Sequence, residues 1–268
     1  MATGGRAQLQ RAAIDSGFGY QRELRGPGLP GVLFRAGSKV VASDVIDARA
    51  SAAPFIAGGL TALYGEDSSL PSMAVTSFVA IPLERTVPNI LLFGKGIGAL
   101  RRAGVAVGNR QKLSLEGDFD RSFTLYCPAG YERDALEIFT PDLMQLLMDT
   151  TKGCDVELAD DWMFVYSGPG RYSKADALPG LVAVTERARD KVHRQTSRYR
   201  DERSDRVASA GTISPSEHAA RVGRVAEGGS RLTTRTGPVR IAVTVLSTAL
   251  LVIAGARFLF PDLIPWLP

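Results

Sequence analysis

The chain has 268 residues, 45% hydrophobic and 22% charged, with a formal net charge of +4. This composition is ordinary for a globular protein, and the length exceeds one average domain without reaching two. The two cysteines, Cys127 and Cys154, form no CxxC motif, and both histidines are remote from them in sequence. A structural disulfide and a metal site are therefore not expected, and no cofactor motif is present.

The first half of the chain predicts a short lead-in and then strands. Residues 1–17 are expected to be poorly ordered or a short helix. The run 31–48 alternates around Ala36-Gly37-Ser38 and predicts a β-hairpin, whereas residues 50–72 favour a loop or short helix. Two further strands are predicted at 73–84 and 89–93, from their β-branched and aromatic residues.

The second half of the domain has clearer patterns. Strands are predicted at 112–116 and 121–127, and a hairpin over 154–168 with its turn at 159–161. Between them a helix is predicted from Pro141, with Thr140 as N-cap and Gly153 as its stop. We expect residues 18–170 to form an α+β domain, an antiparallel sheet with helices on one face.

The predicted helix has one apolar face, and that face should cover the sheet. Its members are Leu143, Leu146 and Leu147. Alternate residues of a strand share a face. The bulkiest candidates on the predicted strands are Phe123, Leu125, Trp162 and Phe164. These are the side chains on which we expect the helix to pack.

Residues 171–205 and 206–237 differ from the domain in composition. Leu181, Val184, Ala188 and Val192 give a helix over 171–205 only a thin apolar stripe. The segment 206–237 is rich in Arg, Gly, Ser and Thr and predicts a flexible basic linker.

The C-terminus predicts a transmembrane helix at 238–260, followed by a tail at 261–268. Ile241 to Ala256 are sixteen residues without a charge. Spanning a bilayer takes about 20 apolar residues, and Ile241 to Phe260 suffices if Arg257 extends its long stem to the headgroups. Trp266 lies where interfacial aromatics are found. A buried helix of a soluble domain is the alternative for so short a run.

Charge predicts the orientation of this anchor. Residues 171–240 contain 15 Lys and Arg and 8 Asp and Glu, a net charge of +7. Arg235 and Arg240 lie closest to the apolar run and, with Arg257 and Trp266, are the candidate membrane-interface residues. Positive residues stay cytoplasmic, so the N-terminal bulk should face the cytosol. This pattern predicts a single-pass, tail-anchored protein of the inner cell membrane, with anionic headgroups as candidate partners.

Carboxylate pairs are the candidate catalytic residues. Asp118 and Asp120 form one pair, and Asp160 and Asp161 form the other. Paired acids can act in general acid–base catalysis or bind Mg²⁺, but both pairs lie in predicted turns, where Asp is common because it bonds its own backbone.

A glycine-rich connection and a basic segment complete the motifs. Gly94, Gly96 and Ala99 match G-x-G-x-x-A after a strand, but Gly98, Gly104 and Gly108 would break the helix of a dinucleotide site, so a plain loop is expected. The segment 187–206 holds eight Arg and Lys against four acids. It allows phosphate contacts of a nucleic acid, headgroup contacts, or simply a solvated helix.

The stretch EGDFDRSFTLYCPAGYERDALEIFTPDLMQLL, with DVELADDWMFVYS after it, resembles a segment of uncharacterised, mostly actinobacterial membrane proteins of unknown function. The resemblance covers about residues 111–168. It implies a membrane-associated domain and no catalytic residues. The high ratio of Arg to Lys, 26 to 6, is likewise typical of GC-rich bacteria.

These observations favour a partner-binding or scaffold module at the inner face of the membrane, with an unidentified protein partner. A membrane-associated, metal-dependent hydrolase using the turn aspartates is the alternative. Nucleic-acid binding through 187–206 is a weaker one.

Overall fold

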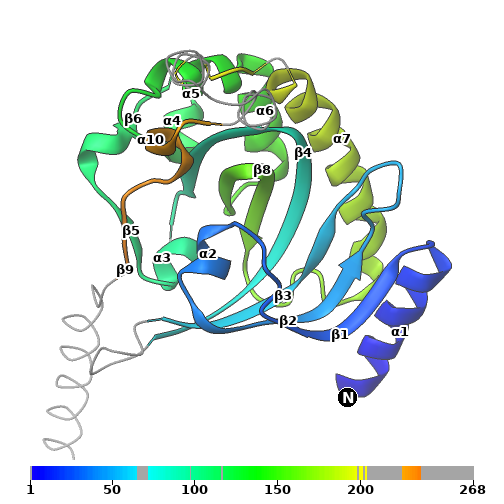
Figure 1. The fold of residues 1–268 in the computed structure, drawn as a ribbon. Coiled ribbons are helices and arrows are strands. Elements are labelled where there is room, and N and C mark those ends of the chain that lie inside the picture. The colour runs from blue at the N-terminus through cyan, green and yellow to red at the C-terminus, as the bar shows by residue number, and fades with distance from the viewer. Residues whose placement is uncertain are drawn as a thin grey trace, which may run out of the picture.

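The computed structural model describes residues 2–64, 72–96, 98–115, 117–197, 199–201, 203 and 225–236. An antiparallel sheet curves through the molecule, with long helices against its convex side and short helices inside the curve (Figure 1). The strands are β1 Gly19–Arg25, β2 Ser38–Asp47, β3 Ile56–Tyr64, β4 Ser72–Gly94, β5 Val105–Val107, β6 Lys112–Leu113, β7 Phe123–Tyr126, β8 Asp155–Ser167 and β9 Thr234–Thr236. The helices are α1 Ala2–Asp15, α2 Val32–Arg35, α3 Ala99–Arg102, η1 Asn109–Gln111, α4 Phe119–Ser122, α5 Glu132–Ile138, α6 Pro141–Thr150, η2 Ala175–Ala177, α7 Leu178–Thr196 and α10 Glu227–Ser230.

The α+β class with a large antiparallel sheet is confirmed. The strand order is β1-β2-β3-β4-β7-β6, and β8 also pairs with β4, while β5 and β9 form a separate small sheet. Helices lie on both faces of the large sheet, not on one as expected. The reason is that α2 and α3 fill the inside of its curve, where their apolar residues join the concave core.

The two longest strands differ from the prediction. The expected strands 73–84 and 89–93 are one 23-residue strand, β4. The expected hairpin over 154–168 does not form, because β8 is one 13-residue strand paired with β4 from Val156 to Ser167. Asp160 has a φ of 55°, and the register shifts between Pro82 and Ile90. These irregularities bend both strands instead of reversing the chain.

The strands β1 and β3 and the helix α2 are among the elements that the sequence analysis did not predict. β1 is largely exposed and polar, so it shows no alternation. β3 contains Gly58 and Gly59, which read as loop residues, but a Cβ on either would lie within 3.0 Å of Ser43 on β2. Glycine is needed there for the close approach of two strands. Residues 32–35, expected as a strand, are helix α2, with Val32, Leu33 and Phe34 buried.

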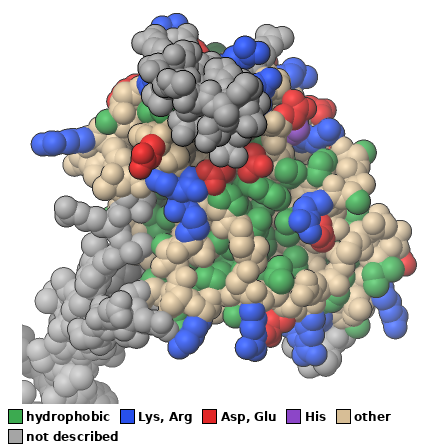
Figure 2. Space-filling model, in the orientation of Figure 1, with side chains coloured by type: hydrophobic (Ala, Val, Ile, Leu, Met, Phe, Trp, Pro, Cys, Tyr) green, Lys and Arg blue, Asp and Glu red, His purple; other side chains and the backbone are tan. Residues whose placement is uncertain are grey.

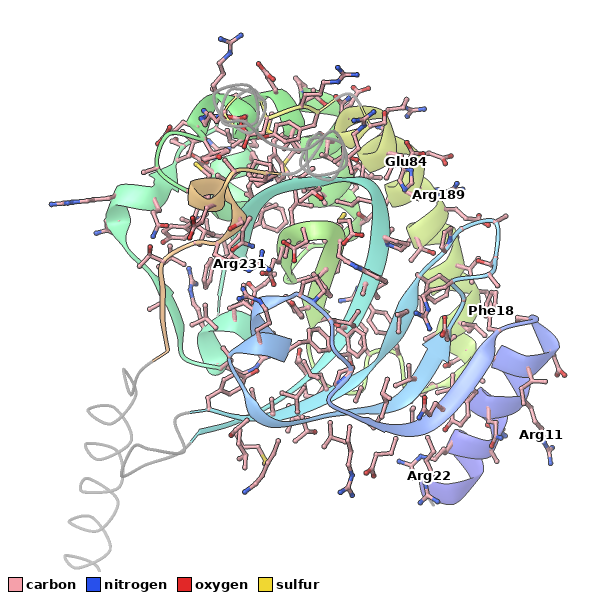
Figure 3. The ribbon with its side chains drawn as sticks, viewed as in Figure 1. Arg11, Phe18, Arg22, Glu84, Arg189 and Arg231 are labelled. Carbon is pink, nitrogen blue, oxygen red and sulfur yellow. The ribbon has the colours of Figure 1, made fainter. Side chains whose placement is uncertain are left out.

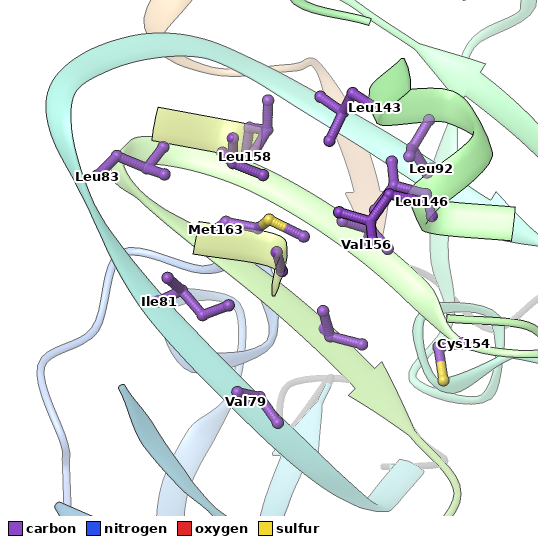
Figure 4. Packing of buried hydrophobic residues seen from close by; sticks show 14 of the residues in the cluster. Val79, Ile81, Leu83, Leu92, Leu143, Leu146, Cys154, Val156, Leu158 and Met163 are labelled. Carbon is purple, nitrogen blue, oxygen red and sulfur yellow. The ribbon is translucent and has the colours of Figure 1, made fainter. Parts of the chain in front are cut away.

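Both faces of the sheet are buried, and each has its own core. Val156, Leu158 and Met163 belong to the convex core, with Leu143, Leu146 and Leu147 of α6 (Figure 4). Phe123 and Leu125 lie in the same core, as expected. Trp162 and Phe164 instead belong to the concave core. Because both faces of the sheet are buried, bulky side chains occur on both of them. The size of a side chain therefore did not indicate which face of the sheet it lies on.

Truncating Leu146 to alanine should lower the free energy of unfolding by about 2–3 kcal/mol. The value lies in the lower part of the usual range because the residue is still 9% exposed. The neighbouring Gln145 is exposed, and its amide donates to Asp149 on the same helix, so Gln145→Ala should be near neutral. Guanidinium unfolding of residues 1–236 measures both. Equal losses would mean that α6 does not cover the sheet.

The segment expected as a free charged helix packs on the sheet. Leu181, Ala188 and Val192 of α7 are buried in the convex core, whereas Val184 is 36% exposed. Part of the expected linker is also docked on the domain, since residues 225–236 contain α10 and β9. Helix α1 at the N-terminus contributes Leu9, which is fully buried.

The predicted membrane segment 238–260 and the tail 261–268 lie outside the described residues, as do Arg240, Arg257 and Trp266. Arg235 is in β9. Among the helices of the described residues, none combines the length and the apolar composition that a membrane-spanning segment requires.

Candidate functional site

The first aspartate pair lies at α4. Asp118 forms an ion pair with Arg121 at 2.8 Å, and both side chains are exposed. Asp120 accepts hydrogen bonds from the Ser114 hydroxyl and, at 3.1 Å, from the Leu115 amide. Both carboxylates thus bind residues close to them in the chain, which is a structural role common for Asp.

The second pair lies in the bend of β8. Asp160 binds Arg231, with 2.7 Å between Oδ2 and Nη2, while Asp161 is exposed. Among the described residues there is no group of three or more His, Cys, Asp or Glu that could hold a metal ion. The structure therefore offers no support for the hydrolase alternative, which would need such a group.

Arg231 begins a clamp that holds the end of the described chain on the domain. Figure 3 shows it inside the curve of the sheet, which it reaches from the segment after α10. The next residue, Leu232, is buried, and its amide donates to the Asn89 side chain at 3.0 Å. Residues 234–236 then pair with Val105–Val107 of β5. An ion pair, a buried side chain and a strand thus fix the chain in succession.

Glu157 is the centre of a buried hydrogen-bond network that connects this clamp to the concave core. Its side chain is fully buried. One carboxylate oxygen accepts from the Val32 amide and from the Tyr166 hydroxyl, each at 2.8 Å. The other accepts from the Asn89 side-chain amide at 3.1 Å. Glu157 thus links α2 to β4 and β8, and through Asn89 to the clamp.

Burial and hydrogen bonding act on Glu157 in opposite directions. Burial favours the neutral acid and raises its pKa to about 7, while the three donors and the nearby Arg35 guanidinium oppose that rise. The strongest of the three donors, by its effect on the pKa, is the Val32 amide. A carboxyl group that titrates near neutral pH thus lies inside the fold.

Asp155, two residues earlier on β8, explains the glycine-rich connection. Its carboxylate accepts the amides of Gly94 and Leu100, each at 2.8 Å. A Cβ on Gly98 would collide with this carboxylate, and one on Gly94 with the Cys154 carbonyl. These glycines let the loop approach β8 closely, which is a structural reason for the pattern.

Basic residues of 187–206 bind groups of the domain itself. Arg189 donates to the Ala52 carbonyl, and Lys191 to the Asp142 carbonyl at 3.2 Å. Figure 3 shows Arg189 and Glu84 beside α7. Arg203 binds Asp134 and Asp201 and lies 4.1 Å from the centre of the Tyr131 ring. These three cations therefore stabilise the fold.

The hollow side of the sheet presents an apolar surface. Figure 2 shows hydrophobic side chains gathered in the middle of this face, with charged side chains around them. Leu29 and Trp162 pack against the concave core without being fully buried. Beside this face is an open groove of about 940 Å³, lined by residues that include Arg110 and Arg231.

Sequence reasoning missed Glu157 and Asp155. In the run CDVELADD, acids alternate with apolar residues, which reads as a strand with one solvated face. The structure buries both faces. The sequence did contain an indication of a second buried face, because the same strand continues with three alternating aromatic residues, Trp162, Phe164 and Tyr166.

No protein-family model and no curated protein matches the chain. A similar solved structure is the crystal structure of the mycobacterial trehalose monomycolate transport factor A, TtfA. The two share 14% sequence identity and a TM-score of 0.45, over 70% of this chain and 94% of that one. Similarity of this size does not establish a common fold, and the transport role of TtfA is not carried over to this chain.

Proposed function

We propose that this protein is a single-pass, tail-anchored membrane protein whose α+β domain is a partner-binding or scaffold module on the cytoplasmic side of the inner membrane. The proposal rests on the uncharged run 241–256, the basic excess before it, and the clamp at residues 231–236.

The clamp is the observation that carries the proposal. Strand β9 ends at Thr236, and four residues separate it from Ile241. Four residues span at most about 14 Å when fully extended. A membrane helix whose uncharged run starts at Ile241 would therefore hold the β5–β9 end of the domain close to the bilayer surface.

The charge at that end fits an anionic surface. Helix α3, which contacts β5, contains Arg101 and Arg102, and η1 after β5 contains Arg110. A basic residue near an anionic membrane contributes about 1 kcal/mol of attraction. The apolar hollow of the sheet, in this arrangement, is the surface on which a protein partner would bind.

Fluorescence quenching by brominated lipids tests the tether. A bimane label is placed on Gly108→Cys, next to β5, or on Ile14→Cys, on the exposed face of α1. Both positions are exposed, and Figure 1 shows α1 on the opposite side of the domain from β9. The natural cysteines are buried and should stay unlabelled. In vesicles containing the full chain, we expect strong quenching at position 108 and little at position 14.

Two results would contradict the proposal. Equal quenching at both positions would mean that the β5–β9 end is not held at the membrane. Release of the full chain from membranes by carbonate, to the same extent as a chain ending at Thr236, would mean that residues 237–268 contain no anchor.

A further inference from the structure

A second apolar feature lies on the convex side of the sheet, far in sequence from the clamp. A pocket of about 280 Å³ lies between α7 and the β4–β8 pair. Val79, Ile81 and Met163 form its floor, and Figure 4 shows these three on one face of the two strands. Leu181 and Ala188 of α7 form the opposite wall.

The threonine hydroxyl groups in the lining are already used by the fold. Thr150 donates to the Leu146 carbonyl and Thr151 to the Leu147 carbonyl, each at 2.7 Å. Thr185 donates to the carbonyl of Val182 at 2.8 Å. The walls therefore present mostly carbon atoms to an occupant.

Among the described residues that line this pocket, the charged one is Arg171. Its Nη1 lies 3.5 Å from Cys154 Sγ, and its backbone amide donates to Ser77. Burial raises the pKa of the Cys154 thiol, so this group stays neutral and supplies no counter-charge. A guanidinium has five N–H donors, and the contact with sulfur engages one of them. The exposed Arg171 can therefore bind an anion at the mouth of the pocket.

The volume sets the size of the occupant. At about 280 Å³ the pocket is slightly smaller than the roughly 300–1,000 Å³ typical of sites for drug-sized ligands, so it suits a smaller molecule. Apolar pockets with a single well-placed polar group are typical ligand sites. We propose that this pocket binds a medium-chain monocarboxylate, with its alkyl chain on the β4–β8 face and its carboxylate on Arg171. The proposal does not depend on the membrane tether.

Native mass spectrometry of the full chain, released from non-ionic detergent micelles, counts bound octanoate directly. We expect one saturable site. Arg171→Gln should weaken octanoate at least about tenfold and leave octan-1-ol unchanged, because it removes the charged contact alone. Gly180→Met should weaken both ligands. Gly180 lines the pocket and no atom lies within 4 Å of an added Cβ, so methionine fits there without a backbone clash, and we expect its side chain to occupy part of the pocket.

Arg133→Gln is the matched control, since Arg133 is an exposed arginine of α5 that pairs with Glu137 on the same helix. It should bind octanoate as the natural chain does. Octanoate binding that does not saturate would overturn the proposal. So would equal affinity in the natural chain and Arg171→Gln, or Gly180→Met that binds normally.

Discussion

Replacing Glu157 by alanine is expected to lower the free energy of unfolding by about 3–5 kcal/mol. The change leaves the Val32 amide and the Tyr166 hydroxyl without their acceptor inside a fully buried region, while the Asn89 amide loses one bond and retains its bond to the Leu158 carbonyl. A buried donor without a partner costs about 1–3 kcal/mol. The loss is a large part of the roughly 5–15 kcal/mol that stabilises a domain.

Glu23→Ala is the matched control for this prediction. Glu23 is also a glutamate in a strand, but its side chain is 51% exposed and pairs with an exposed Arg25. Such surface pairs contribute little, so the substitution should be near neutral. Guanidinium unfolding of residues 1–236 compares the two. A loss at Glu157 no greater than that at Glu23 would mean that the network does not hold α2 in the sheet.

The choice of residues 1–236 follows from the structure. The sequence indicated a domain of residues 18–170, but Leu9 before it and Leu232 after it are buried. A chain trimmed to the expected boundaries would expose these apolar contacts. The sequence indicated these wider boundaries only weakly. Leu232 stands alone among polar residues, and its burial depends on contact with the concave core, which other parts of the chain form.

Local patterns predicted some elements well. Helix α6 has Pro141 at its first turn and a compact leucine face, and both are properties of neighbouring residues. The class of fold followed from short strands and short connections in the second half. These predictions succeeded because the information for them lies within a few residues.

Elements that depend on distant contacts were not predictable in this way. The glycines of β3 suit a close approach to Ser43, and Gly31 lies where a Cβ would collide with the Tyr166 hydroxyl. The first requirement comes from the preceding strand, β2, and the second from β8, far along the chain. The same holds for Glu157, whose donors are on β8, on β4 and at the start of α2. The sequence shows that residue 157 is an acid, but it does not indicate which groups donate hydrogen bonds to it.

The position of Glu157 also predicts how stability depends on pH. Its folded pKa is raised from 4.5 to about 7, chiefly by burial. For such a group the stabilisation is fully present below pH 4.5 and is lost as pH rises through 7, because the unfolded chain releases the proton first. The raised pKa corresponds to roughly 3 kcal/mol. The free energy of unfolding should therefore fall by about this amount between pH 4.5 and 7.5.

Glu157→Gln isolates this contribution. Glutamine has the shape of the neutral acid but does not titrate, so it removes the Glu157 part of the slope over this range. Asp155, whose pKa burial also raises, remains in both proteins and cancels in the comparison. The measurement is guanidinium unfolding of residues 1–236 at intervals of pH, with and without the substitution. Parallel curves for the two proteins would show that Glu157 has the same pKa folded and unfolded, and that its three donors fully offset the effect of burial.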